Sequence, residues 1–127
     1  MIRLLLLLPF GLLLLATATP AAQQSPAISL TLNPLIGYRP LTVEARVLIE
    51  PNYQNRGVCI VWESNVYSGA GCWQVEGQYA PLAHYYTIKN LQTTVDVTTM
   101  YTIYAELITV RDRIVTPAQT VQVFHRF

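Results

Sequence analysis

The sequence predicts an all-β fold, a two-sheet antiparallel sandwich of about seven strands. From Ala27 onward, β-branched and aromatic residues dominate, and no segment keeps a helical period over about ten residues. Turn-forming Gly, Pro, Asn and Asp interrupt the chain at intervals of roughly ten residues. The segment Leu41 to Glu50 alternates apolar and polar side chains, which is the period of a half-buried strand.

The first 26 residues are predicted to lie outside this fold. Arg3 precedes an apolar run, Leu4 to Leu15, of about 12 residues, against roughly 20 needed to span a bilayer. Small residues follow at Ala16 and Ala18. This order is typical of a secretory signal peptide at 1–18, with a membrane anchor as the alternative. A Pro/Ala/Gln/Ser-rich flexible lead-in is expected at 19–26, and the β-sandwich domain at 27–127.

Charge and compartment exclude one class of partner. Cleavage would leave 109 residues (127 − 18) with 7 Lys+Arg, after loss of Arg3, against 7 Asp+Glu. A domain so evenly charged lacks the basic surface that nucleic acid requires. We therefore expect a secreted, periplasmic or cell-surface protein with no nucleic-acid partner and no membrane span after cleavage.

The strands are assigned from these patterns in chain order. Ile28 to Leu32 forms a short first strand, which Asn33-Pro34 ends, and Gly37 and Pro40 frame a turn before the strand at Leu41 to Glu50. Beyond the central hairpin described next, strands are expected at His84–Lys89, Tyr101–Arg111 and Gln119–Phe124, with Val95–Thr98 as a short strand or an extension.

Both cysteines and both tryptophans fall in one stretch, Val58 to Trp73, which we interpret as a β-hairpin. In an exported protein Cys59 and Cys72 predict a disulfide; two free thiols or a metal pair are the alternatives. If the cysteines lie opposite each other, paired residue numbers sum to 131. The same-face pairs are then Val58 with Trp73, Ile60 with Gly71, and Trp62 with Gly69, and each glycine leaves room for the larger side chain opposite.

Four segments resemble PKD-type immunoglobulin-like domains. Gly37 to Ala45 (Gly-Tyr-Arg-Pro-Leu-Thr-Val-Glu-Ala) is similar to the Gly-x-x-Pro-Leu-Thr-Val opening of that family, and Trp62 falls where it has a strand tryptophan. His84-Tyr85-Tyr86 resembles its His-x-Tyr segment, and Tyr101 to Leu107 its penultimate strand. The family's Asp-Phe-Gly-Asp-Gly after the tryptophan is replaced by Glu63-Ser64-Asn65-Val66-Tyr67. The resemblance implies an immunoglobulin-like (PKD-like) sandwich used for surface display, adhesion or binding, and does not imply an enzyme.

The chemistry-bearing residues form no recognisable constellation. His84 and His125 have no ligand spacing to other histidines, cysteines or carboxylates, so no metal is expected. The seven carboxylates are scattered, and no serine lies in a nucleophile motif. We expect no catalytic residues and no cofactor.

Tyrosines are the remaining signal, because their rings suit surfaces that are apolar on one side and wet on the other. The ligand-binding candidates, all expected in loops, are Tyr53, Asn65, Tyr67 and Tyr79. The alternative is that such rings only pack over the edges of the sandwich. Trp62 and Tyr101 are assigned to the structural core, with Tyr101 anchoring a corner at the start of its strand.

The sequence leaves three functional hypotheses. The first is a non-catalytic binding or adhesion module that holds an extracellular protein or glycan through loop tyrosines and an open sheet edge. The second is a structural subunit that associates with copies of itself on a cell or virion surface. The third is a small secreted hydrolase or inhibitor.

Overall fold

A computed structural model describes residues 27–79 and 82–125 of the 127-residue chain. The predicted signal peptide and lead-in fall on residues 1–26 and lie outside this description. The described elements are β1 (Ile28–Asn33), β2 (Ile36–Tyr38), β3 (Leu41–Ile49), β4 (Asn55–Glu63), β5 (Ser68–Gln74), a 3₁₀ turn η2 (Gly77–Tyr79), β6 (Ala83–Leu91), β7 (Thr99–Thr109), β8 (Arg113–Val115) and β9 (Gln119–Phe124).

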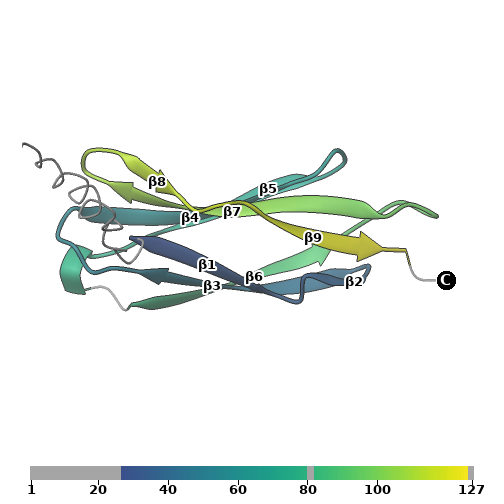
Figure 1. The fold of residues 1–127 in the computed structure, drawn as a ribbon, viewed down its shortest axis with the longest axis horizontal. Coiled ribbons are helices and arrows are strands. Elements are labelled where there is room, and N and C mark those ends of the chain that lie inside the picture. The colour runs from purple at the N-terminus through teal and green to yellow at the C-terminus, as the bar shows by residue number, and fades with distance from the viewer. Residues whose placement is uncertain (1–26, 80–81, 126–127) are drawn as a thin grey trace, which may run out of the picture.

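The strands form two sheets that pack face to face (Figure 1). The smaller sheet has the order β1-β3-β6, and the larger has the order β2-β9-β7-β4-β5, with β8 also pairing with β7. The predicted two-sheet sandwich is therefore confirmed. It contains nine described strands where about seven were expected, and the β2–β9 pair is parallel where the expectation was wholly antiparallel.

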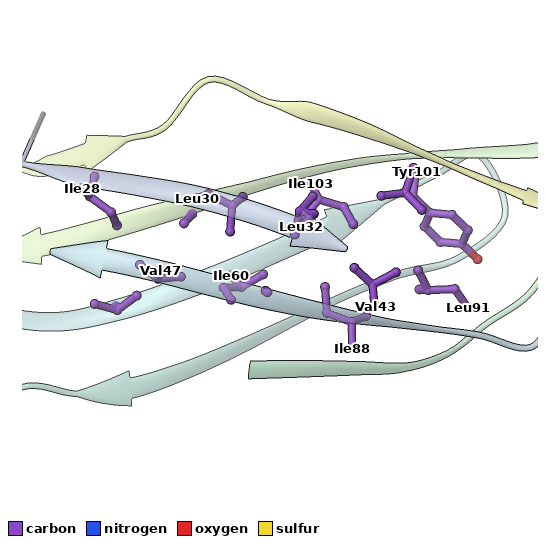
Figure 2. Close-up of a cluster of buried hydrophobic side chains, with 14 of the residues drawn as sticks. Ile28, Leu30, Leu32, Val43, Val47, Ile60, Ile88, Leu91, Tyr101 and Ile103 are labelled. Carbon is purple, nitrogen blue, oxygen red and sulfur yellow. The ribbon is translucent and has the colours of Figure 1, made fainter. Parts of the chain in front are cut away.

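The core lies between the sheets and follows the period of two in the sequence. In β3 every second residue from Leu41 to Ile49 is buried, and Val43 and Val47 are wholly inaccessible to solvent. Figure 2 shows these side chains meeting Ile60 of the opposite sheet and residues of β1 and β6. Such interdigitated β-branched and aliphatic side chains supply the hydrophobic stabilisation of the sandwich.

Three segments differ from the strand assignment made from the sequence. The segment around Gly37, expected to be a turn, contains β2. Glycine at this position leaves space for the Leu41 side chain, since a Cβ there would lie 2.5 Å from Leu41 Cδ1. The residues Val95–Thr98 form a turn, not a strand, because Asp96 adopts a positive φ of 59° and the Val97 amide donates to the Thr94 carbonyl. The strand β8, Arg113–Val115, lies between the expected strands at Tyr101–Arg111 and Gln119–Phe124, where no strand was assigned.

Tyr101 anchors the connection between β6 and β7. Its ring is wholly buried, and its hydroxyl donates to the Gln92 carbonyl (2.7 Å) and accepts from the Gln92 amide (3.2 Å). Burial raises the pKa of the Tyr101 hydroxyl above its ordinary value of 10.0, while the hydrogen bond to Gln92 opposes the shift. This side chain therefore ties Gln92, the first residue of the β6–β7 connection, to the core.

Candidate functional site

The β4–β5 hairpin has the register that the cysteines predict. Cys59 lies opposite Cys72, and Trp62 opposite Gly69. The two cysteines form a disulfide with Cα atoms 4.1 Å apart, the short spacing of a non-hydrogen-bonded antiparallel pair. Cys72 is exposed, so the disulfide lies on the outer face of the larger sheet. A disulfide of this kind indicates an oxidising environment.

The two glycines of β5 pair with Trp62 and Ile60 as predicted, and both make room for aromatic rings, but the ring at Gly71 is not the predicted neighbour. A Cβ at Gly69 would lie 2.6 Å from the Trp62 ring, as expected. A Cβ at Gly71 would collide with the ring and hydroxyl of Tyr86, not with Ile60. The predicted neighbour of Gly71 is wrong because Tyr86 reaches across from β6 in the other sheet, a contact that pairing within the hairpin does not contain.

These rings belong to an aromatic row that closes the sandwich between β5 and β6. Tyr86 stacks on Trp73 with centroids 5.8 Å apart and planes 8° apart, and it contacts Trp62 at 6.0 Å. Trp73 Nε1 donates to His84 Nδ1 at 3.2 Å, so His84 is a hydrogen-bonded, half-buried residue. Because the four side chains are half-buried and pack against one another, the row is a structural element of the sandwich.

The hairpin tip, residues 64–67, is held in one conformation by Ser64. The Ser64 amide donates to the Tyr67 carbonyl at 2.8 Å, and Ser64 Oγ accepts from the Tyr67 amide at 2.9 Å and the Val66 amide at 3.2 Å. Asn65, Val66 and Tyr67 are exposed on this turn. The tip therefore presents their side chains from a fixed backbone.

The four ligand-binding candidates do not come together. Tyr53 precedes β4, whereas Asn65 and Tyr67 follow it, and a nine-residue strand separates the two positions by roughly 26 Å. Tyr79 is the last residue of η2, on the side of Tyr53: a Cβ at Gly77 would lie 3.2 Å from Tyr53 Cα. A hollow of about 340 Å³ lies between the Tyr53 turn and the start of η2.

The end that carries Asn65 and Tyr67 also gathers apolar side chains that the sequence analysis did not select. The strand pairings place these segments at one end of the larger sheet. Ile36 of β2 and Met100 of β7 both pair with Gln122 of β9. The hairpin tip follows Glu63, which pairs with Thr102, two residues along β7 from Met100. Figure 1 shows the β4–β5 turn, the β6–β7 connection and β2 at this same end. Eight of the thirteen exposed large hydrophobic residues lie here, each 43–61% exposed; we call them the apolar end: Leu35, Ile36, Tyr38, Val66, Tyr67, Val95, Val97 and Met100.

The sequence signal that could have located part of the apolar end is the pair of valines on either side of Asp96. Val95 and Val97 alternate with polar residues and were assigned to a strand, but Asp96 turns the segment and leaves both valines in solvent. A hollow of about 200 Å³ lies between this segment and the end of β9, lined in part by Val97 and Phe124. Exposed apolar surface concentrated in one region is characteristic of interaction sites.

The described part of the chain shows no arrangement typical of a metal or cofactor site. No group of three or more His, Cys, Asp and Glu side chains within it could hold a metal ion. Glu106 pairs with Arg113 at 3.2 Å, and Glu44 accepts a hydrogen bond from Thr87 at 3.0 Å, so these two carboxylates interact with neighbouring surface residues. Among the same residues, no helix has the length and apolar character needed to cross a membrane.

Comparison with known proteins gives no relative: no family model, no curated protein and no solved structure matches the chain.

Proposed function

We propose that this protein is a non-catalytic binding or adhesion module of the secreted, periplasmic or cell-surface space, and that it binds a protein through the apolar end. The observation that carries the proposal is the gathering of most exposed large hydrophobic side chains at one end of the sandwich. The disulfide supports the compartment, because such bonds persist where the environment is oxidising.

The strand order supports an immunoglobulin-like interpretation of the sandwich. The parallel pairing of β2 with β9 and the position of β7 between β9 and β4 suit that architecture. The Tyr101 hydroxyl bonds the backbone nine residues upstream, as in the tyrosine corner of immunoglobulin-like domains. Binding residues of such domains commonly lie on loops at one end of the sandwich.

A protein ligand fits the apolar end better than a glycan. Its exposed side chains are mostly aliphatic, among them Leu35, Ile36, Val97 and Met100. Sugars are usually held by flat aromatic rings beside polar groups, whereas aliphatic side chains gain affinity by burial against another apolar surface. Tyr67, at the rigid tip, supplies an aromatic anchor of the kind that dominates protein interfaces.

The experiment is a binding screen of the chain, expressed with export to an oxidising compartment, against arrays of extracellular proteins and of glycans. The matched variants are Tyr67→Ala at the apolar end and Tyr53→Ala at the opposite end, where the ring is 69% exposed. A specific protein signal should weaken about ten-fold or more with Tyr67→Ala, the size of a single anchor residue, and stay unchanged with Tyr53→Ala. A signal that only Tyr53→Ala removes would move the binding site to the other end.

A further inference from the structure

One strand edge of the sandwich lacks the usual protection against pairing. β5 lies at the outer side of the larger sheet and, among the described strands, pairs only with β4. Its sequence, Ser-Gly-Ala-Gly-Cys-Trp-Gln, contains no charged residue and no proline. Natural edge strands generally carry a lysine, a proline, a bulge or a covering segment, because unpaired backbone groups otherwise attract another strand.

Each of the other four described edges shows such a device. β8, which pairs only with β7, is three residues long and carries the charged Arg113. β2 is only three residues long and lies between Pro34 and Pro40. The edge of β1 is covered in part by Gln119 of β9, whose Nε2 donates to the Leu30 carbonyl at 2.7 Å. β6 carries Lys89, and its pairing with β3 is broken by a register shift. Among the described edges, β5 is therefore the one best suited to accept another strand.

The hydrogen bonds at the two ends of the hairpin show which backbone groups of β5 point outward. The Val75 amide donates to the Arg56 carbonyl, and the Ser64 amide donates to the Tyr67 carbonyl, so residues 67 and 75 face β4. Alternate residues of an antiparallel strand direct both backbone groups to the same side. The amides and carbonyls that face the open edge are therefore those of Ser68, Ala70, Cys72 and Gln74.

We propose that β5 is a homodimer interface, at which the β5 strands of two copies pair antiparallel with Gly71 on the two-fold axis. In this register Ala70 lies opposite Cys72 of the second copy, and Ser68 lies opposite Gln74 of the second copy. By symmetry all four outward-facing residues of each strand then find a partner that points toward them, and each pair can exchange both backbone hydrogen bonds. A shift of two residues in either direction would leave residues at the end of each strand unpaired.

The occupant is a second copy because β5 is complementary to itself. The strand brings no charge to the interface, so self-pairing opposes no like charges. The register also places the exposed side chains of one strand beside exposed side chains of the other. It places Gly69 opposite Trp73 of the second copy, which repeats the glycine–aromatic pairing found within the hairpin. The Cys59–Cys72 disulfide holds β5 against β4, so little ordering is needed when the second strand arrives.

The proposed dimer interface is the open edge of β5, and it shares no residue with the apolar end. It rests on the proposed function only in treating the protein as a non-catalytic interaction module. Self-association is measured with the pure protein, whereas the proposed function is measured by capture of a different protein. The dimer proposal and the proposed binding function can therefore be refuted independently of each other.

The test is sedimentation velocity of the full chain, exported and disulfide-bonded, over a concentration series. Ala70→Pro removes an amide that faces the open edge and leaves the bonds to β4 in place, as prolines do on edge strands. We expect a reversible monomer–dimer equilibrium for the unmodified chain and a dimer dissociation constant about 30-fold higher for Ala70→Pro, from two hydrogen bonds lost per dimer. The control, Ala70→Ser, keeps the amide and should leave the constant unchanged.

A pair of double variants tests the register without altering the backbone. Ser68→Lys with Gln74→Lys places like charges opposite each other across the axis and should weaken the dimer, whereas Ser68→Glu with Gln74→Lys places opposite charges there and should preserve it. Far-UV circular dichroism reports whether each variant keeps the β fold. A chain that stays monomeric at every concentration overturns the proposal. So does a dimer that neither Ala70→Pro nor the lysine pair weakens, because its contact must then lie elsewhere.

Discussion

Gly71 is the position at which the hairpin and the opposite sheet constrain each other most closely. Gly71→Ala would place a methyl group within the ring of Tyr86, which cannot move freely because it stacks on Trp73 and contacts Trp62. Overpacking of this kind costs about 1–3 kcal/mol, and the better strand propensity of alanine returns about 0.5–1 kcal/mol. We expect a net loss of about 1–2 kcal/mol in the free energy of unfolding.

A double-mutant cycle identifies the cause of that loss. In a Tyr86→Leu background the methyl group has space, so Gly71→Ala should become neutral or slightly stabilising; in an Ile60→Val background the loss should persist. The assay is urea unfolding followed by tryptophan fluorescence, since Trp62 and Trp73 both lie beside the site. An equal loss in the Tyr86→Leu and unmodified backgrounds would refute the assignment of Gly71 to Tyr86.

Three further predictions concern stability. Tyr101→Phe leaves the Gln92 amide and carbonyl without their partner and should lower the free energy of unfolding by about 2 kcal/mol; a thermal shift indistinguishable from zero would argue against the corner. The pKa of Tyr101 is raised in the folded state, so the contribution of its hydroxyl to the free energy of unfolding is constant below pH 10.0 and falls as the pH rises further. The difference in unfolding free energy between the unmodified chain and Tyr101→Phe should therefore shrink only above that pH. Replacing Cys59 and Cys72 together by alanine opens a loop with a sequence separation of 13 and should cost about 3 kcal/mol, and an unchanged urea midpoint would rule out a stabilising disulfide.

The parts of the fold that the sequence predicts are those with local causes. The alternation in Leu41 to Ile49 reflects a strand with one buried face, and it needs no knowledge of the partner strands. The single assumption that Cys59 faces Cys72 determines the whole hairpin register, because one covalent link fixes which residues can pair. The Tyr101 anchor was likewise expected from its position near the start of a long strand.

The parts that the sequence analysis missed depend on distant segments. Strand β2 exists because Ile36 to Tyr38 meets β9 more than eighty residues later, and a three-residue segment has no period of its own. The partner of Gly71 was missed because Tyr86 comes from the other sheet. The separation of Tyr53 from Tyr67 follows from the length of β4, which places the loops before and after a strand at opposite ends of the sandwich.

The apolar end and the hydrogen bonds beneath it together suit the proposed binding of a protein surface. Ser64 holds the tip through its bonds to Val66 and Tyr67, and Tyr101 holds the start of the β6–β7 connection through Gln92. Both devices reduce the conformational entropy that the exposed side chains would lose on binding. A surface held in this way would lose less free energy to ordering when its apolar side chains are buried. The hydrogen bonds beneath the apolar side chains therefore support the proposed binding together with the side chains themselves.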